Sequence, residues 1–308
     1  MPLPEPNIAV LLAAYNGMQW IREQLDSIQA QQNVAVHIFI SVDASTDGTG
    51  SWCEHYASQC TNVTLLPASE PCGGAAKNFF RLIRDVELER FELIALADQD
   101  DIWHEDKLHR AACYLAASNA HAYSSNVTAF WPDGTTRLLN KAQQQVRWDH
   151  YFEAAGPGCT YVLVNEFACF LQQRVRTDLQ ELQQVTLHDW YIYAIARTHG
   201  YTWYIDPVPG MSYRQHTNNQ VGANIGVSAL LARYHSIRSG WWFGQVQLIE
   251  KLAYARSPSV TRPEWRALQR SHLLRLCLEA RHCRRRRRDQ WLFGLLCFVT
   301  AVIRGPQR

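Results

Sequence analysis

The chain has 308 residues, of which 47% are hydrophobic and 19% are charged. This composition is typical of a folded protein with a sizeable core and excludes an intrinsically disordered chain. The formal net charge is only +2, so the molecule as a whole lacks the basic surface of a nucleic-acid-binding protein. We therefore predict one large domain, or one domain with an appendage, and no nucleic-acid partner.

The nine cysteines include no C-x-x-C pair, and their number is odd. A disulfide framework or a structural zinc site is therefore not expected, and a reducing cytoplasm is the simpler interpretation. The apolar run from Ile8 to Ala14 follows no basic segment, so it predicts a first core strand rather than a signal peptide. An uncharged apolar stretch of about 18 residues is absent, so we expect no membrane-spanning helix.

The first part of the chain alternates between apolar strands and amphipathic helices. Strands are predicted over residues 7–14, 34–42, 62–66 and from 93 onward, and helices over residues 18–31, 50–59, 75–86 and 105–117. Such alternation indicates βαβ units and a mostly parallel sheet. Because the carboxyl ends of parallel strands meet at one edge, three polar loops are expected to face a common site: residues 14–17, 43–49 and 98–101.

The pattern changes after residue 117. Strand character returns at residues 122–131, 159–164, 201–205 and 211–213, and a helix is predicted from Leu187 to about Thr198. Beyond Gly226 the chain is predicted to be helical. We therefore predict a first domain over residues 1–225 and a helical C-terminal region over residues 226–308.

The apolar strand that begins at Leu93 ends abruptly at a cluster of acids, Asp98, Asp100 and Asp101. Carboxylates crowded together repel one another unless a cation or a hydrogen-bond donor intervenes. A hard divalent cation that also holds phosphate oxygens is the natural partner. The alternative is a solvated acidic turn that caps the next helix.

Neither a G-x-G-x-x-G after the first strand nor a P-loop motif is present, which argues against a dinucleotide-binding fold and a P-loop protein.

Four short motifs occur in order along the chain: LAAYNG from Leu12, SVDASTDGT from Ser41, ADQDDIW from Ala97 and HDW from His188. Together they resemble family 2 glycosyltransferases of the GT-A fold. The resemblance implies an α/β fold with a mostly parallel central sheet plus a C-terminal helical extension. The segment from Leu187 to Asn219 further resembles bacterial rhamnosyltransferases that build O-antigen, lipopolysaccharide core or capsule. The chain departs from the family at the acidic pair, which is Val42-Asp43 here, and at Ala44, where the family has glycine.

The resemblance implies a set of residues that bind the donor nucleotide: Ala14, Tyr15, Asp43, Lys77, Asp98 and Arg214. Asp43 would accept from a nucleobase N–H, although a turn cap is the alternative. Lys77 lies where a helix begins, a position that favours phosphate, but a merely solvated lysine is the alternative. Tyr15 is about equally compatible with an ordinary turn aromatic.

The resemblance further implies that Asp100 and His216 bind a divalent metal ion, Mg²⁺ or Mn²⁺, which would neutralise the leaving nucleoside diphosphate. Asp189 is the candidate catalytic base, because an inverting transfer needs one carboxylate to take the acceptor proton. Three residues are candidates for acceptor contact: His188, Trp190 and Cys159. Structural packing is the alternative for His188, Trp190 and His216. For Asp101 two roles are possible: support of the metal site, or the N-terminal cap of the next helix.

Near the C-terminus five consecutive arginines, Arg284 to Arg288, precede an apolar run from Trp291 to Ile303. This combination suits an interfacial helix on anionic lipid. The alternative is an ordinary amphipathic helix packed on the catalytic domain. We expect a cytoplasmic protein held peripherally at the inner face of the cell membrane.

These patterns lead to one functional hypothesis. The chain is predicted to be an inverting, metal-dependent glycosyltransferase that moves L-rhamnose from dTDP-L-rhamnose to a glycan or glycolipid acceptor of lipopolysaccharide, O-antigen or another surface polysaccharide. The alternative is a non-catalytic protein on the same fold that binds a nucleotide-sugar or a glycan.

Overall fold

The computed structural model describes residues 5–216, 240–255 and 268–303. The chain divides into two compact units. The first, here called the sheet unit, comprises residues 1–142, 156–189 and 201–223, and the second, the helical unit, comprises residues 143–155, 190–200 and 224–308. The boundary predicted near Gly226 lies outside the described residues.

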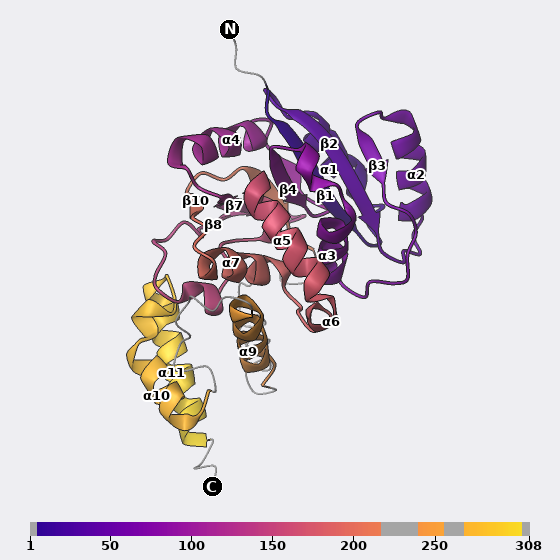
Figure 1. The fold of residues 1–308 in the computed structure, drawn as a ribbon. Helices are drawn as coiled ribbons and strands as arrows, with labels where there is room; N and C mark the ends of the chain where they lie inside the picture. Colours follow the sequence, from indigo (N-terminus) through magenta and orange to yellow (C-terminus); the bar gives the residue numbers. More distant parts are fainter. Residues whose placement is uncertain (1–4, 217–239, 256–267, 304–308) are drawn as a thin grey trace. The chain divides into compact units, whose positions relative to one another are not determined.

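The sheet unit is built on a seven-stranded sheet (Figure 1). Its strands are, in spatial order, β10 (Trp203–Asp206), β6 (Ala122–Ser125), β9 (Val162–Val164), β4 (Leu93–Ala97), β1 (Asn7–Ala14), β2 (Ala35–Val42) and β3 (Val63–Leu65). All neighbours are parallel except β9, which runs antiparallel to both β4 and β6. The predicted mostly parallel sheet is confirmed.

Strand β1 is the centre of this sheet. Its residues from Ile8 to Ala14 are all buried, as expected for a parallel strand covered on both faces. The register places Ala14 opposite Val42 and Leu12 opposite Ala97. The carboxyl ends of β1, β2 and β4 are therefore adjacent, and the polar loops that follow them meet at one edge of the sheet.

Helices connect the strands of the sheet unit. They are α1 (Ile21–Gln29), α2 (Thr49–Gln59), α3 (Ala75–Asp85), α4 (Lys107–Ser118), α5 (Asn165–Thr177) and α6 (Leu179–Leu182), together with the short turns η1 (Leu88–Arg90) and η3 (Gly158–Thr160). In α1 the buried residues Ile21, Leu25 and Ile28 recur at helical spacing and form the stripe that faces the core. Helix α5 was not predicted from the sequence.

A second sheet of four strands completes the sheet unit. Its order is β5 (Ile102–Trp103), β11 (Met211–Arg214), β7 (Val127–Phe130) and β8 (Thr136–Leu139). Because β11 pairs with β5 directly after the acidic turn, residues from late in the chain reach the carboxyl end of β4.

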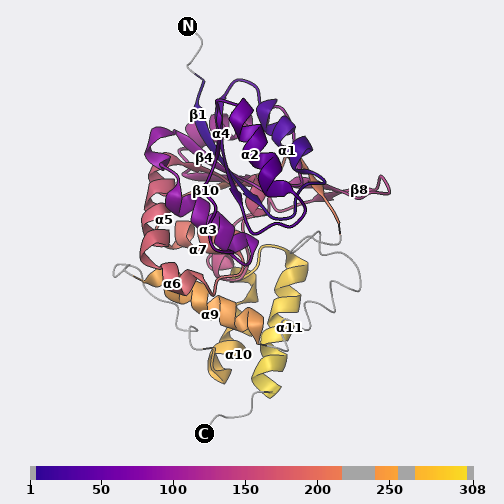
Figure 2. The ribbon, with the colours of Figure 1, turned by 90° about the vertical axis from the view of Figure 1, so that its right-hand side faces the viewer.

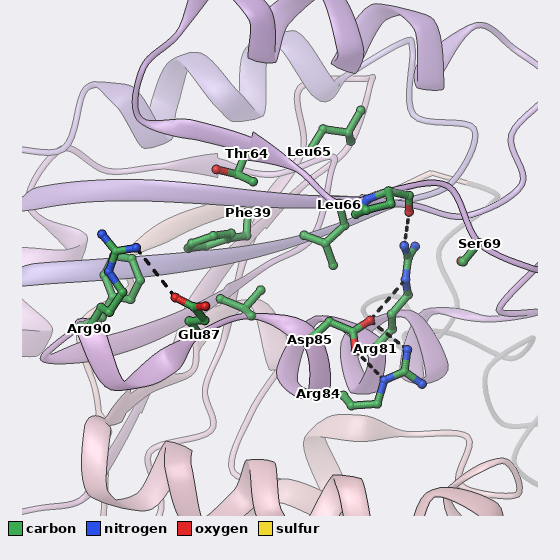
Figure 3. Close-up of a pocket in the computed structure, with 13 residues that line it drawn as sticks. Phe39, Thr64, Leu65, Leu66, Ser69, Arg81, Arg84, Asp85, Glu87 and Arg90 are labelled. Carbon is green, nitrogen blue, oxygen red and sulfur yellow. Dashed lines mark hydrogen bonds and ion pairs between the residues drawn. The ribbon is translucent and has the colours of Figure 1, made fainter.

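A pocket of about 500 Å³ lies in the sheet unit, between β2, β3, the C-terminal half of α3 and η1 (Figure 3). Its apolar residues include Phe39, Leu66 and Phe91. The arginines at its rim are already engaged, since Arg84 pairs with Asp85 at 2.6 Å and Arg90 with Glu87 at 3.8 Å. None of the acids that follow β4 lines this pocket, so it contributes nothing to their chemistry.

The helical unit contains most of α7 (His188–Thr198), and also α9 (Trp241–Tyr254), α10 (Arg270–Leu278), α11 (Arg287–Ile303), η2 (Asp149–Tyr151) and η4 (Ala280–His282). Helices α10 and α11 pack against each other (Figure 2). Gly294 lies at this contact, where an added Cβ would be in van der Waals contact with the carbonyl oxygen of Cys277, at 3.4 Å. Among the described residues, no helix has the length and apolar character needed to cross a membrane.

The helical unit buries part of the arginine run. The side chain of Arg285 is only 1% exposed; its Nη1 lies 3.5 Å from Asp149 Oδ2 and its Nε 3.6 Å from Glu153 Oε1. Arg284 also pairs with Glu153, at 3.6 Å. The run is therefore not one continuous basic surface, because its first two members hold the 149–154 segment.

Candidate active site

The acidic turn after β4 is the centre of the site. Asp98 is partly buried, whereas Asp100 is 9% and Asp101 0% exposed. Burial raises the pKa of Asp98 to about 7, and the carboxylates of Asp100 and Asp189 add to the rise. Burial and the charges of Asp100 and Asp98 also raise the pKa of Asp101 well above its usual range. These carboxyl groups repel one another, and a bound cation would relieve that repulsion.

Gln99 joins this turn to the loop after β1. Its Oε1 accepts a hydrogen bond from the Tyr15 backbone N–H at 2.7 Å, and its Nε2 donates to the Tyr15 carbonyl at 2.8 Å. A Cβ at Gly17 would lie 2.2 Å from Gln99 Oε1, so only glycine leaves room for this contact. The side chain of Tyr15 itself is 56% exposed, in keeping with a ring available to a ligand. Sequence reasoning missed Gln99, although it stands between the acids.

His216 reaches the acidic turn from the segment after β11. Its Nε2 lies 2.7 Å from Asp100 Oδ2. The imidazole stacks on the ring of Trp20, with ring centroids 4.0 Å apart. The structure thus brings together the two residues predicted as metal ligands. Trp20 was not predicted as part of the site, because only the fold places it beside a residue so distant in sequence.

Arg214 is held by several groups around the acidic turn. Its backbone N–H donates to Asp101 Oδ1 at 3.1 Å, and its Nε donates to the Asp100 carbonyl at 2.8 Å. Its Nη2 donates to the carboxylate of Glu23. Asp101 therefore anchors β11 rather than capping a helix, since α4 begins only at Lys107. The predicted contact of Arg214 with a diphosphate stays a prediction.

Asp43 lies at the end of β2 and binds the loop before α3. Its carboxylate accepts hydrogen bonds from the backbone N–H groups of Ala44 (2.8 Å), Cys72 (2.7 Å) and Gly73 (3.0 Å). A carboxylate has about four lone-pair sites, so one remains for a nucleobase N–H. The loop-binding role is what the structure shows, and base recognition stays a prediction.

Three further groups surround Asp43. The Ala14 carbonyl accepts from the Asp43 N–H at 2.8 Å and from the Asn78 side chain at 3.3 Å. Asn78, which the sequence did not single out, therefore fixes the end of β1. Lys77 lies in the first turn of α3, with its Nζ 4.0 Å from where a Cβ on Gly73 would be. Its ammonium group is thus beside the loop that Asp43 binds.

Asp189 lies in the first turn of α7 and is partly buried. It is close enough to the acidic turn for its charge to raise the pKa of Asp98. The Tyr161 hydroxyl donates to its backbone carbonyl at 3.2 Å and helps to fix the start of the helix. The structure therefore brings the candidate base to the same site as the acids that follow β4.

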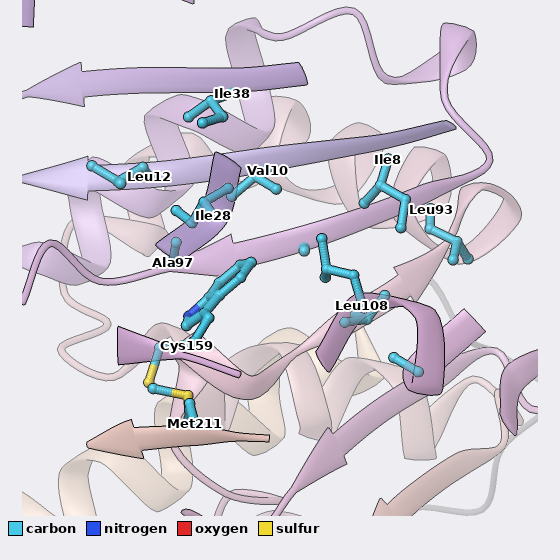
Figure 4. Packing of buried hydrophobic residues seen from close by; sticks show 14 of the residues in the cluster. Ile8, Val10, Leu12, Ile28, Ile38, Leu93, Ala97, Leu108, Cys159 and Met211 are labelled. Atoms are coloured by element: carbon cyan, nitrogen blue, oxygen red, sulfur yellow. The ribbon is translucent and has the colours of Figure 1, made fainter. Parts of the chain in front are cut away.

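The three predicted acceptor contacts stay predictions, and the structure places all three side chains in buried positions. Cys159 is 0% exposed and lies beside Met211 in the core (Figure 4). Trp190 is 3% exposed, and its Nε1 donates to the His150 carbonyl at 3.0 Å. His188 stacks on Phe79 at 4.0 Å, and burial lowers its pKa to about 3. The contacts that the structure shows for Trp190 and His188 are packing contacts.

A buried lysine accompanies the acids. Lys107 is 1% exposed, and its Nζ lies 3.3 Å from the centroid of the Trp103 ring. Burial lowers its pKa to about 7, and the Asp101 carboxylate, when ionised, opposes that change. The lowered pKa allows the buried amine to be neutral.

The residues present fit a hard divalent cation. Ligand atoms of Asp98, Asp101 and Cys159 lie within 4.8 Å of one another, and Asp101 Oδ2 is buried with no hydrogen-bond partner. Burial raises the pKa of the Cys159 thiol well above its usual range, so this thiol stays protonated and is a poor ligand. The remaining donors are carboxylates and the His216 imidazole, a set suited to Mg²⁺ or Mn²⁺.

Comparison with known proteins agrees with this geometry. Residues 6–155 match the family model described as glycosyltransferase like family 2. The chain is also 47% identical over 239 residues to dTDP-rhamnosyl transferase RfbG of Shigella flexneri, a match that covers 77% of this chain and 83% of that protein. The chain belongs to glycosyltransferase family 2. It is therefore an enzyme, a glycosyltransferase, as predicted.

Other similar proteins are more distant. The putative teichuronic acid biosynthesis glycosyltransferase TuaG of Bacillus subtilis (strain 168) is 24% identical over 166 residues, which cover 52% of this chain and 63% of that protein. The crystal structure of S. aureus TarS residues 1–349 in complex with UDP has a TM-score of 0.57 at 14% identity, covering 96% of this chain and 81% of that one. This likeness confirms the predicted GT-A fold.

Proposed function

We propose that this family 2 glycosyltransferase transfers L-rhamnose from dTDP-L-rhamnose, with inversion and with a divalent metal ion. The acceptor we propose is a lipopolysaccharide, O-antigen or other surface-polysaccharide intermediate. Support for the donor comes from the 47% identity to dTDP-rhamnosyl transferase RfbG, which extends over most of both chains.

The proposed mechanism rests on the position of Asp189, which lies in the first turn of α7 and is close enough to Asp98 for the two carboxyl groups to interact electrostatically. The candidate base, Asp189, therefore lies at the same site as the acids that follow β4. In the proposed step, an acceptor hydroxyl oxygen attacks the anomeric carbon of the donor and forms the new glycosidic bond. Asp189 takes the hydroxyl proton, and the bond from the anomeric carbon to the phosphate oxygen breaks. The nucleoside diphosphate leaves with that electron pair.

We propose that Asp100 and His216 hold Mg²⁺ or Mn²⁺ and that Asp98 approaches the donor nucleotide at the ribose and metal side. Such a cation, when bound, neutralises the charge that develops on the leaving diphosphate. Residues around the end of β1 and β2 would hold the nucleotide: Ala14 and Tyr15 through the loop that Gln99 fixes, and Asp43 through its free lone pair. Lys77 and Arg214 would bind the diphosphate.

We further propose that the enzyme acts in the cytoplasm at the inner face of the cell membrane on a glycolipid acceptor. The support is the apolar and basic composition of residues 284–303. In this proposal residues 1–225 form the catalytic domain and residues 226–308 form the membrane-associating region.

A donor panel tests the proposal. Melting temperature and donor hydrolysis would be measured with dTDP-rhamnose, UDP-sugars and GDP-sugars, each with and without Mg²⁺ or Mn²⁺. We expect stabilisation and slow, metal-dependent hydrolysis with dTDP-rhamnose. A clear preference for a UDP- or GDP-sugar would reject the donor assignment, and hydrolysis unaffected by a chelator would reject the metal.

A further inference from the structure

The outward side of α11 is strongly apolar. Seven large side chains on this 17-residue helix are exposed. They are Trp291 (83%), Leu292 (46%), Leu295 (60%), Phe298 (49%), Val299 (42%), Val302 (55%) and Ile303 (77%). At 100° per residue they occupy one continuous arc of the helix. We call these seven residues the α11 face.

The opposite side of α11 is buried and carries one large residue, Phe293, whose ring lies 4.8 Å from that of Phe152. The other buried residues on this side are small: Gly294, Cys297 and Ala301. A helix of a water-soluble domain ordinarily turns its large apolar residues inward and its polar residues outward. Helix α11 buries Phe293 but leaves seven large apolar residues exposed, so the α11 face is placed for contact with something outside the helical unit.

Polar groups near the α11 face are few, and their arrangement is informative. The Thr300 hydroxyl donates to the Leu296 carbonyl at 2.8 Å, so its donor is satisfied within the helix. From Gln290 to Ile303 the sequence has no charged residue. The exposed arginines Arg287 and Arg288 begin the helix, and Arg288 Nε lies 3.5 Å from Asp289 Oδ1. A cationic end followed by an uninterrupted apolar arc matches an interface that is anionic at its surface and apolar below.

We infer that the α11 face docks on an anionic phospholipid bilayer, with the helix lying in the plane of the membrane surface. This inference rests on the proposed membrane association and assigns it to particular residues. The helix would be about 25 Å long at 1.5 Å per residue, and no described helix can cross a membrane, which fits lying on the bilayer rather than spanning it. The lipid contact comes from Arg287, Arg288 and the α11 face, not from Arg285, which Asp149 and Glu153 already hold.

The apolar contact is expected to supply most of the binding, and the arginines to select the lipid. Insertion of seven large apolar side chains removes much apolar surface from water. The free energy gained from that burial is larger than the free energy that two exposed arginines gain from charge interactions with the lipid. Charge interactions at a surface are also screened by salt. Binding should therefore persist at moderate ionic strength. It should also be stronger on vesicles with anionic headgroups than on vesicles without them.

The test is co-sedimentation of the full chain with vesicles. We expect the wild type to pellet with vesicles of phosphatidylglycerol and phosphatidylethanolamine, and much less with vesicles of phosphatidylcholine alone. The double variant Leu295→Glu with Phe298→Glu should lose at least about tenfold in partition, because it places charge in the apolar layer. Leu138→Glu is the matched control, since Leu138 is 52% exposed on β8, and it should bind as the wild type does.

Two outcomes would overturn the inference. One is a wild type that does not bind anionic vesicles. The other is a wild-type dimer in sedimentation velocity that the double variant dissociates, because the α11 face would then be covered by a second copy of the chain. Transfer to a soluble acceptor analogue is measured in parallel. If the wild type binds vesicles but transfers nothing, the proposed function fails while the docking surface stands.

Discussion

His216 Nε2 lies 2.7 Å from Asp100 Oδ2, although 116 residues separate them in the chain. The contact exists because β11 pairs with β5 and so brings the segment after Arg214 to the end of β4. An imidazole beside a carboxylate, at a turn with two more carboxyl groups, is the donor set that a divalent ion would use.

Loss of either member of this pair should weaken metal binding. For His216→Ala we expect at least about a tenfold weaker affinity for Mn²⁺ in the presence of dTDP, because the substitution removes one of the few metal-ligating side chains of the proposed site. Calorimetric titration of Mn²⁺ measures this directly, without reliance on turnover. His104→Ala, on an exposed histidine of the same unit, should titrate as the wild type does. Unchanged Mn²⁺ affinity in His216→Ala would remove His216 from the proposed site.

The contact of Gly17 with Gln99 predicts that a small substitution at Gly17 weakens donor binding. Gly17→Ala should raise the KM for the donor, because the new methyl group would displace Gln99 and release the loop that holds Tyr15. Gly50→Ala is the matched control: a Cβ there meets nothing within 4 Å, and alanine in helix α2 should stabilise by about 0.5–1 kcal/mol.

A double mutant separates the steric effect from a general one. In a Gln99→Ala background, Gly17→Ala should cost little more than Gln99→Ala alone, because the clash is gone. If the two effects on KM simply multiply, the proposed clash is not their cause.

Buried His188 makes stability depend on pH. Burial lowers its pKa to about 3, from 6.5 in the unfolded chain. Because the folded state excludes the charged imidazolium, this contribution is fully present above pH 6.5 and is lost as the pH falls toward 3. The slope is at most about 1.4 kcal/mol per pH unit for one group.

Denaturant unfolding of the wild type and His188→Gln, at several pH values, checks this. The advantage of the wild type over the variant should shrink as the solution is acidified. All other titrating groups are common to the two proteins, so their contributions cancel. A difference that does not change with pH would show that His188 takes up its proton equally in both states.

The buried arginine predicts that members of one basic run differ in their effects. Arg285→Met should lower the free energy of unfolding by about 3–5 kcal/mol, because Asp149 and Glu153 lose a buried partner. Arg288→Met is the same change on a side chain that is 71% exposed, and it should cost no more than about 0.5 kcal/mol. Equal costs in chemical denaturation would contradict the assigned network.

The sequence predicts most of the sheet, because local patterns encode it. The unbroken apolar run of β1 and the spaced Ile21, Leu25 and Ile28 of α1 are each visible within a few residues. Helix α5 was missed. Its buried set mixes Phe167, Leu171 and Val175 with polar Gln172 and Arg174, which blurs the apolar stripe.

The site could be predicted only where the chemistry is local. Acids close together in the sequence, such as Asp98 and Asp100, can be recognised from the sequence alone. The stacking of Trp20 on His216 cannot, because only the fold brings these two segments together. Likewise, five consecutive arginines look alike in sequence. Burial of Arg285 depends on Asp149, which lies far earlier in the chain.

The most direct test of the proposed mechanism is single-turnover transfer by Asp189→Asn beside a measurement of donor affinity. The amide keeps the shape of the side chain but cannot take the acceptor proton, and general-base catalysis contributes about 10²–10⁴-fold. We predict a loss of that order in transfer, with the affinity for dTDP-rhamnose unchanged and with Glu166→Gln, an exposed carboxylate in α5, as active as the wild type. Near-normal transfer by Asp189→Asn would contradict the account.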